Sequence, residues 1–225
     1  MSLPVVMPAQ IQLYLHSISD LICQQPSDFA QRRDWIAYQK QQLHAYRLAC
    51  LNRFLASQLT QPLSATDLSQ TDMGKPFLRH YPHCAFNHSH SPLHYALVIS
   101  TDVQDLGVDV EDLSRKVRFE ALAQHAFHAE EYQHWVNTGF DPSYWFQIWT
   151  TKEAVLKASG LGIRMSLNQL NTQCVFQQAQ GRCQHAELGQ FAYQHIQQGN
   201  AWVTLAWRDE ETGQWPEIIL EDLSV

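Results

Sequence analysis

A long stretch without Gly or Pro is the feature that most constrains how this chain can fold. From Ser27 to Leu59 nothing interrupts a helix, and apolar side chains recur at helical spacing. We expect two consecutive helices there. Helical patterns return between Phe119 and Val136 and from Asp141 to Ser159. The last of these begins with an N-cap residue followed by Pro142.

Short apolar runs separated by turn residues fill much of the remaining chain. They are Cys84 to Phe86, His94 to Ser100, Leu106 to Val110, Gln173 to Gln177, Phe191 to Ile196, Ala201 to Trp207 and Ile218 to Leu220. The short turns between them favour antiparallel pairing. The sequence therefore predicts an α+β fold with two similar lobes, residues 1–103 and 104–225, each a small antiparallel sheet packed with helices.

Composition excludes several classes of protein. The 15 Lys and Arg against 22 Asp and Glu give a net charge of −7, which does not favour a nucleic-acid partner. The five cysteines are odd in number and form no C-x-x-C pair, so we expect reduced thiols. The first residues do not resemble a signal peptide, and no stretch approaches the roughly 20 apolar residues of a membrane helix. We expect a cytoplasmic monomer.

Two carboxylates share one face of the expected strand at Leu106 to Glu111. Side chains alternate along a strand, so Asp109 and Glu111 point to the same side, about 7 Å apart. At that distance a cation would relieve their repulsion, and Mg²⁺ prefers oxygen ligands and substrate phosphates. An isolated D-x-E is also typical of a solvated acidic strand edge.

Two charged residues interrupt the apolar stripe of the helix from Asp141 to Ser159. Lys152 and Glu153 lie on or beside the face expected to be buried, where charges need partners. The alternative for Glu153 is a surface pair with Lys157, four residues later.

Three blocks of sequence together resemble the signature of one enzyme family. They are Phe86-Asn-His-Ser-His-Ser91 preceded by Gly74-Lys-Pro76, then Gly107-Val-Asp-Val-Glu111, and finally Trp149-Thr-Thr-Lys-Glu-Ala-Val-Leu-Lys157 with its continuation to Gly162. The chain resembles the 4′-phosphopantetheinyl transferase superfamily, in its two-lobed type represented by the surfactin synthetase activator.

The resemblance implies an activity and a catalytic set in the second lobe. Such an enzyme moves the phosphopantetheine arm of coenzyme A to a serine of an apo acyl or peptidyl carrier protein and releases 3′,5′-adenosine bisphosphate, with Mg²⁺ as cofactor. By resemblance, Asp109, Glu111 and Glu153 are the Mg²⁺ ligands. Glu153 or a metal-bound water accepts the serine proton, and Lys157 neutralises charge on the pyrophosphate.

The resemblance also implies a nucleotide side in the first lobe. The candidate coenzyme A contacts are Arg47 for the 3′-phosphate, Lys75 and Pro76 at the adenine, His90 near the phosphates, and Asn87 and Ser89 beside it. Asn87 is expected to join its turn to the metal loop rather than to touch substrate. For His90 the alternative is a strand-end histidine with no ligand, since the chain has 12 histidines.

Other interpretations remain open. His88 stands where the family more often has an aliphatic residue, and with His83, Cys84 and His90 nearby it raises a zinc site as an alternative. A non-catalytic carrier-protein or coenzyme A binding module is a second alternative. A different Mg²⁺-dependent phosphoryl enzyme is a third, although the sequence has no phosphate-binding G-x-x-x-x-G-K-[ST] loop.

A basic cluster follows the acidic strand. Arg115, Lys116 and Arg118 would offer an acidic carrier protein a positively charged surface close to Glu111. Such a run of charge is also common on ordinary solvated surface.

Overall fold

The computed structural model describes residues 8–162, 165–209 and 214–221, which form two four-stranded sheets and a small two-stranded one. The N-terminal sheet has the order β10-β1-β5-β4, with β1 (Gln10–Ser17), β4 (Ala85–His90), β5 (His94–Ser100) and β10 (Glu217–Glu221). The C-terminal sheet has the order β6-β9-β8-β7, with β6 (Gly107–Asp112), β7 (Gln180–His185), β8 (Gly189–Gln198) and β9 (Ala201–Arg208). The small sheet pairs β2 (Leu68–Gln70) with β3 (Pro76–Leu78).

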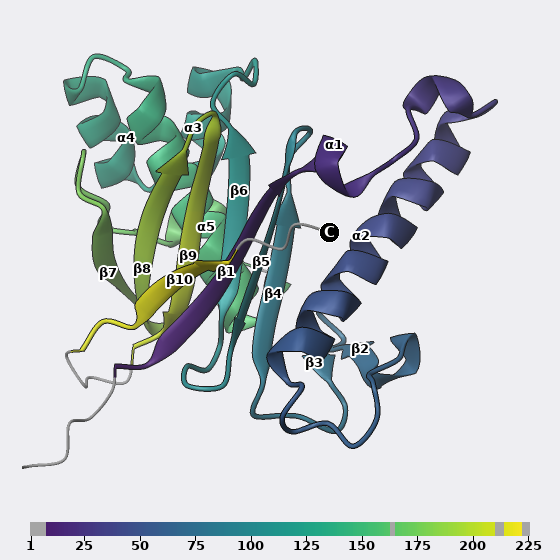
Figure 1. Cartoon of the computed structure of the whole chain (residues 1–225). Helices are drawn as coiled ribbons and strands as arrows, with labels where there is room; N and C mark the ends of the chain where they lie inside the picture. The colour runs from purple at the N-terminus through teal and green to yellow at the C-terminus, as the bar shows by residue number, and fades with distance from the viewer. Residues whose placement is uncertain (1–7, 163–164, 210–213, 222–225) are drawn as a thin grey trace, which may run out of the picture.

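Helices cover the outer faces of the two larger sheets (Figure 1). The long helix α2 (Arg32–Phe54) packs on the N-terminal sheet, and α5 (Pro142–Ser159) packs on the C-terminal sheet with α3 (Phe119–Ala126) and α4 (Ala129–Asn137). The remaining helical pieces are short: α1 (Ile18–Leu21) and three single turns. No helix in the described residues is both long enough and apolar enough to cross a membrane.

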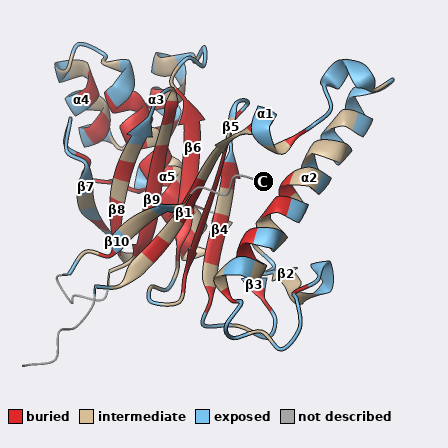
Figure 2. Cartoon of the chain, viewed as in Figure 1, coloured by how far each residue is buried: buried red, intermediate tan, exposed pale blue. Residues whose placement is uncertain are grey.

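Three apolar cores hold these layers together. One lies between α2 and the N-terminal sheet, one between the C-terminal sheet and its helices, and the third between the two sheets. Burial is therefore greatest along the central strands, whereas much of the outer surface of α2 is exposed (Figure 2). The α+β fold class expected from the sequence is confirmed. The division at residues 103 and 104 stays a prediction.

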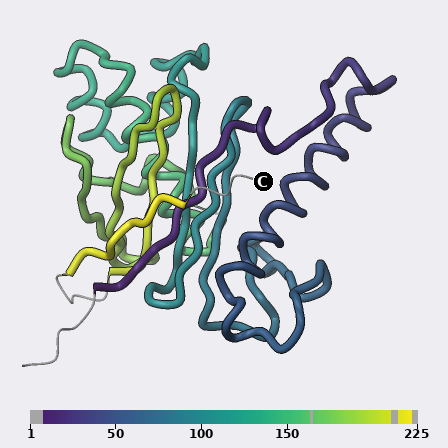
Figure 3. The backbone as a smooth tube through the Cα atoms, in the orientation of Figure 1, coloured from purple at the N-terminus to yellow at the C-terminus, as the bar shows by residue number. Residues whose placement is uncertain are grey.

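The ends of the described chain meet in one sheet. Strand β10 pairs with β1 in parallel, with Ile11 opposite Ile218 and Leu13 opposite Leu220 (Figure 3). The expectation of antiparallel pairing is wrong for this strand, because it joins the N-terminal sheet rather than its sequence neighbours. Every other ladder in the described residues is antiparallel.

Two further expectations about single elements are wrong. The stretch from Ser27 to Leu59 forms one continuous helix, α2, because no breaker divides it, and turns follow after Phe54. Gln173 to Gln177 is not a strand. Both of those glutamines have positive φ, at 54° and 65°, and the strand begins later, at Gln180.

The boundaries of α5 agree with its sequence signals. The side chain of Asp141 accepts a hydrogen bond from the backbone of Tyr144 at 2.9 Å, and Pro142 occupies the first turn. Gly160 ends the helix in the left-handed conformation, with φ of 72°, which residues with a side chain rarely adopt.

Candidate active site

Strand β6 lies directly against α5 at a glycine. A Cβ atom on Gly107 would come within 2.2 Å of the carbonyl oxygen of Ala154, a separation that atoms cannot reach. Only glycine therefore permits this approach. Asp109 and Glu111 follow on the same face of the strand, so the contact brings them close to the polar side chains of α5.

Asp109 is the centre of a buried polar cluster. It is 5% exposed, and its Oδ1 accepts hydrogen bonds from Lys157 Nζ at 2.7 Å and from Ser89 Oγ at 2.8 Å. Lys157 Nζ also donates to Ser89 Oγ at 2.8 Å. The cluster thus joins β4, β6 and α5. The other oxygen, Asp109 Oδ2, is buried and has no partner among the described residues.

Glu111 and Glu153 lie in the electrostatic field of Asp109. Both oxygens of Glu111 accept from Arg115 Nη1, at 2.6 and 2.7 Å. Burial raises the pKa of Glu111, while Arg115 lowers it in part. Burial and then the charge of Asp109 raise the pKa of Glu153, and Lys157 opposes them. A shared cation would relieve these repulsions.

The described residues contain no group of three or more His, Cys, Asp and Glu side chains gathered tightly enough to hold a metal ion. The three predicted ligands therefore do not form a closed site. Their chemistry still fits a hard divalent ion, because all donors are carboxylate oxygens and Asp109 Oδ2 is buried without a partner. Lys157 and Arg115 supply the neutralising charge in this structure.

A cavity of about 380 Å³ opens beside this cluster. Its walls come from the turn between β2 and β3, from β4 and from α5. They include five of the site residues predicted from sequence, namely Lys75, Pro76, Asn87, Glu153 and Lys157. They also include His88, which stands where the family more often has an aliphatic residue. The cavity wall thus includes members of both halves of the predicted site. The predicted residues that do not line it are Arg47, Ser89, His90, Asp109 and Glu111.

Two of these residues are already engaged. Lys75 Nζ donates to Asp105 Oδ1 at 2.8 Å and to the carbonyl oxygen of Ala158 at 2.6 Å, so it joins the turn before β3 to the end of α5. Asn87 is 3% exposed, and its Oδ1 accepts from the backbone N–H of Val108 at 3.4 Å. This contact joins β4 to β6, the strand that carries Asp109 and Glu111.

The basic residues of α2 and β4 face one another. Arg47 donates from Nη2 to His44 Nδ1 at 2.9 Å and from Nη1 to His88 Nε2. His90 is exposed, and its pKa is lowered by partial loss of solvent and by the charges of Lys157 and Lys40. The contact with the guanidinium of Arg47 occupies His88 Nε2, which a zinc ion would need as a ligand.

Sequence reasoning missed Lys40 and His44 as members of this cluster. They are seven and three residues before Arg47, and this spacing places all three on one face of α2. That spacing was available in the sequence. Their proximity to the histidines of β4 was not.

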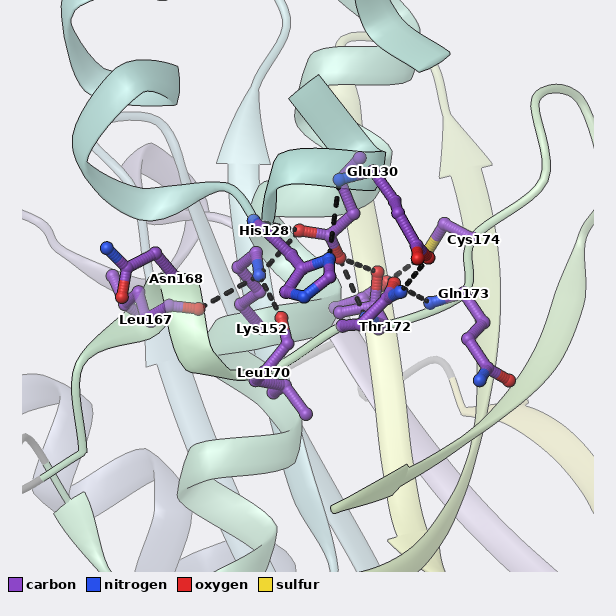
Figure 4. A network of polar contacts seen from close by, with 12 residues as sticks. His128, Glu130, Lys152, Leu167, Asn168, Leu170, Thr172, Gln173 and Cys174 are labelled. Carbon is purple, nitrogen blue, oxygen red and sulfur yellow. Dashed lines mark hydrogen bonds and ion pairs between the residues drawn. The ribbon is translucent and has the colours of Figure 1, made fainter. Parts of the chain in front are cut away.

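Lys152 lies in a separate buried network (Figure 4). It is fully buried, and its Nζ pairs with Glu131 Oε2 at 2.6 Å and donates to the carbonyl oxygens of Leu167 and Leu170. Glu131 also accepts from the backbone and the hydroxyl of Thr172. The network fastens α4 and α5 to the segment before β7.

Comparison with known proteins identifies relatives over part of the chain. Residues 105–207 match the model of the 4′-phosphopantetheinyl transferase superfamily. The 4′-phosphopantetheinyl transferase psf-1 of Bacillus pumilus is 35% identical over 97 residues, which cover 42% of this chain and 40% of that protein. The 4′-phosphopantetheinyl transferase gsp of Aneurinibacillus migulanus is 30% identical over 121 residues, or 52% and 48% of the two chains.

The chain therefore spans about half the length, or less, of these two relatives. The matched segment contains β6 and α5 with Asp109, Glu111, Glu153 and Lys157, whereas Arg47 and the β4 residues lie outside it. The resemblance predicted from the sequence is confirmed: residues 105–207 are similar to the 4′-phosphopantetheinyl transferase superfamily.

Proposed function

We propose that the chain is a Mg²⁺-dependent 4′-phosphopantetheinyl transferase that modifies an apo acyl or peptidyl carrier protein. The observation that carries the proposal is the contact between Asp109 on β6 and Lys157 on α5, beside the cavity. Both residues lie within the segment that matches the superfamily. The carrier could serve fatty-acid, polyketide or nonribosomal-peptide synthesis, and we retain the expectation of a cytoplasmic monomer.

Local positive charge supports coenzyme A as the donor. Although the chain carries a net charge of −7, Lys40, Arg47 and Lys157 lie around β4 and the cavity, and each acts electrostatically on a β4 histidine. Such a cluster can bind the diphosphate and 3′-phosphate of a polyanion. Arg47, Lys75, Pro76, Asn87, Ser89 and His90 are the proposed contacts.

Asp109, Glu111 and Glu153 would hold the Mg²⁺ ion. All three provide carboxylate oxygens as ligands, and Asp109 Oδ2 is buried and has no partner among the described residues. The bound ion would neutralise charge on the diphosphate of coenzyme A. In the proposed site Lys157 contributes a second positive charge close to the reacting group.

The transfer forms one phosphorus–oxygen bond and breaks another. The serine oxygen of the carrier bonds to the phosphorus attached to pantetheine, and the bond from that phosphorus to the bridging oxygen breaks. The 3′,5′-adenosine bisphosphate leaves with that oxygen. In this proposal Glu153 or a metal-bound water would accept the serine proton.

The carrier surface is proposed to lie beside this site. Lys116 and Arg118 are exposed on the segment that leads from β6 to α3. Charge reversal at both should raise KM for the carrier and leave KM for coenzyme A unchanged. Equal effects on the two values would remove this surface from the proposal.

A direct test is to incubate the whole chain with coenzyme A, Mg²⁺ and several apo carriers and to measure the carrier masses. One added phosphopantetheine group per carrier is expected. Asp109→Asn should abolish the addition, whereas Asp34→Asn, at an exposed aspartate of α2, should not. Absence of modification on every carrier would overturn the transferase proposal. Binding of coenzyme A and carrier without transfer would favour a non-catalytic binding module.

A further inference from the structure

Arg47 differs from the other cations that are at least partly buried. Lys75, Lys152, Lys157 and Arg208 each form an ion pair with a carboxylate. Among the described lysines and arginines that are not exposed, Arg47 alone is held by neutral groups, the imidazoles of His44 and His88. Its positive charge is therefore not cancelled by a carboxylate of the part of the chain that the structure describes.

The protonation of His88 follows from this contact. A guanidinium can only donate, so His88 Nε2 must be the acceptor and the ring proton must lie on Nδ1. Burial and then the charge of Arg47 lower the pKa of His88 to about 3, so the ring is neutral at physiological pH. His44 shows a lowered pKa from the same two causes.

His88 is not explained by packing alone. It stacks on Tyr95, with ring centroids 5.9 Å apart, next to the apolar core beneath α2. Its Nδ1 is buried and has no partner among the described residues. An apolar side chain of similar size would avoid burying that unpaired group. A histidine at this position provides a hydrogen-bond acceptor that holds Arg47 in place without neutralising its charge.

We propose that His88, supported by His44, is a positioning residue that orients Arg47 for the 3′-phosphate of coenzyme A. His88 lines the cavity, so it joins the cavity wall to the arginine on α2. A carboxylate in its place would hold the guanidinium equally well but would compete with the phosphate for its charge. This inference rests on the proposed function, in which Arg47 binds that phosphate.

The experiment compares binding of coenzyme A with binding of 3′-dephospho-coenzyme A by calorimetry, using the whole chain. His88→Leu should weaken coenzyme A binding by about tenfold and leave binding of the dephospho compound unchanged. His88→Gln should restore most of the difference, because its amide oxygen can accept from Arg47. His83→Leu, at an exposed histidine that contacts Gln58, is the matched control and should have no effect.

A double-mutant cycle shows whether His88 acts through Arg47. In an Arg47→Gln background, His88→Leu should add nothing to the loss of selectivity. Equal weakening of both ligands, or a further loss in that background, would overturn the inference. His44→Leu, at a partly exposed site, should reduce selectivity in the same direction and keeps the test valid if His88→Leu does not fold.

The role of Arg47 at the 3′-phosphate and the role of His88 in orienting Arg47 can be tested separately. If Arg47→Gln abolishes selectivity and His88→Leu and His44→Leu do not, only the positioning inference is overturned. If Arg47→Gln leaves the preference unchanged, the assignment of Arg47 falls and the inference falls with it. The mass of the modified carrier reports independently on the transferase activity.

Discussion

Arg115 pairs with Glu111, one of the carboxylates that the proposed metal ion would need as a ligand. Its guanidinium contacts both oxygens of Glu111, while Lys157 contacts Asp109. An incoming divalent ion must therefore displace at least one internal cation. Arg115 is the easier one to displace, because its side chain is 41% exposed against 30% for Lys157, and Glu111 is its sole side-chain partner among the described residues.

Replacing Arg115 should strengthen metal binding in the absence of substrate. Arg115→Ala removes a competitor for Glu111, so Mn²⁺ used as a probe should bind about three- to tenfold more tightly, which corresponds to roughly 1 kcal/mol. Mn²⁺ binding can be followed by electron paramagnetic resonance. Lys116→Ala removes the same charge from the adjacent residue and should change affinity less. Weaker binding in Arg115→Ala would contradict the prediction.

Local spacing in the sequence was enough to find part of this site. Alternation along one strand placed Asp109 and Glu111 on one face, and the block around Glu153 gave Lys157. Spacing could not reveal that Asp105 pairs with Lys75, or that His88 meets Arg47, because these partners are distant in sequence and meet only in the fold.

At the scale of elements, the contact between β6 and α5 depends on Gly107. Gly107→Ala would place a Cβ atom 2.2 Å from Ala154 O and 2.5 Å from Ala158 N, both backbone atoms of α5. The helix must move, at a cost of about 1–3 kcal/mol or more. Urea unfolding should show this loss, and coenzyme A should bind more weakly because Glu153 and Lys157 move with the helix.

Gly139 provides the control for this substitution. Its φ of 72° makes alanine unfavourable, but no atom lies within 4 Å of the added Cβ. Gly139→Ala should therefore cost about 1–2 kcal/mol of backbone strain without affecting coenzyme A binding. Normal ligand binding by Gly107→Ala would show that the position of α5 does not depend on this glycine.

The buried ion pair between Lys152 and Glu131 joins α5 to α4. Lys152→Met leaves a buried carboxylate without its cation and should cost about 3–5 kcal/mol in the free energy of unfolding. The double variant Lys152→Met with Glu131→Gln should lose much less free energy of unfolding than the sum of the two single variants, since both changes remove the same interaction. Strictly additive losses in urea unfolding would refute this coupling.

Element boundaries were predictable where a local signal exists. Asp141, Pro142 and Gly160 define α5 through capping and backbone preference, and the structure agrees. The pairing of β10 with β1 has no such signal, because the two strands lie near opposite ends of the chain. The apolar run Cys174-Val-Phe176 was misread as a strand, because its sequence gives no sign of the positive φ at Gln173 and Gln177.

At the scale of the whole molecule, two polar clusters connect the sheets on either side of the site. Asp112, at the end of β6, accepts from Ser91 Oγ at 2.7 Å and pairs with His94 Nδ1 at 2.6 Å. At the other end of the strand, Asp105 accepts from Lys75 and from Arg208. Both ends of β6 are therefore held by polar contacts in addition to the apolar core between the sheets.

Acid should destabilise the whole fold through its buried histidines, and His195 permits a clean test. His195 is 6% exposed, and burial lowers its pKa to about 3, against about 6.5 in an unfolded chain. The unfolded state therefore binds a proton first, so the neutral ring stabilises the fold fully above pH 6.5 and progressively less between pH 6.5 and 3. From pH 7.5 to 5.5 the loss is about 1.4 kcal/mol.

The raised pKa values of Glu111 and Glu153 act in the opposite direction, so the measurement must compare variants. In urea unfolding at the two pH values, His195→Gln should lose about 1.4 kcal/mol less stability than the unmodified chain; equal losses would show that His195 is protonated in the folded state.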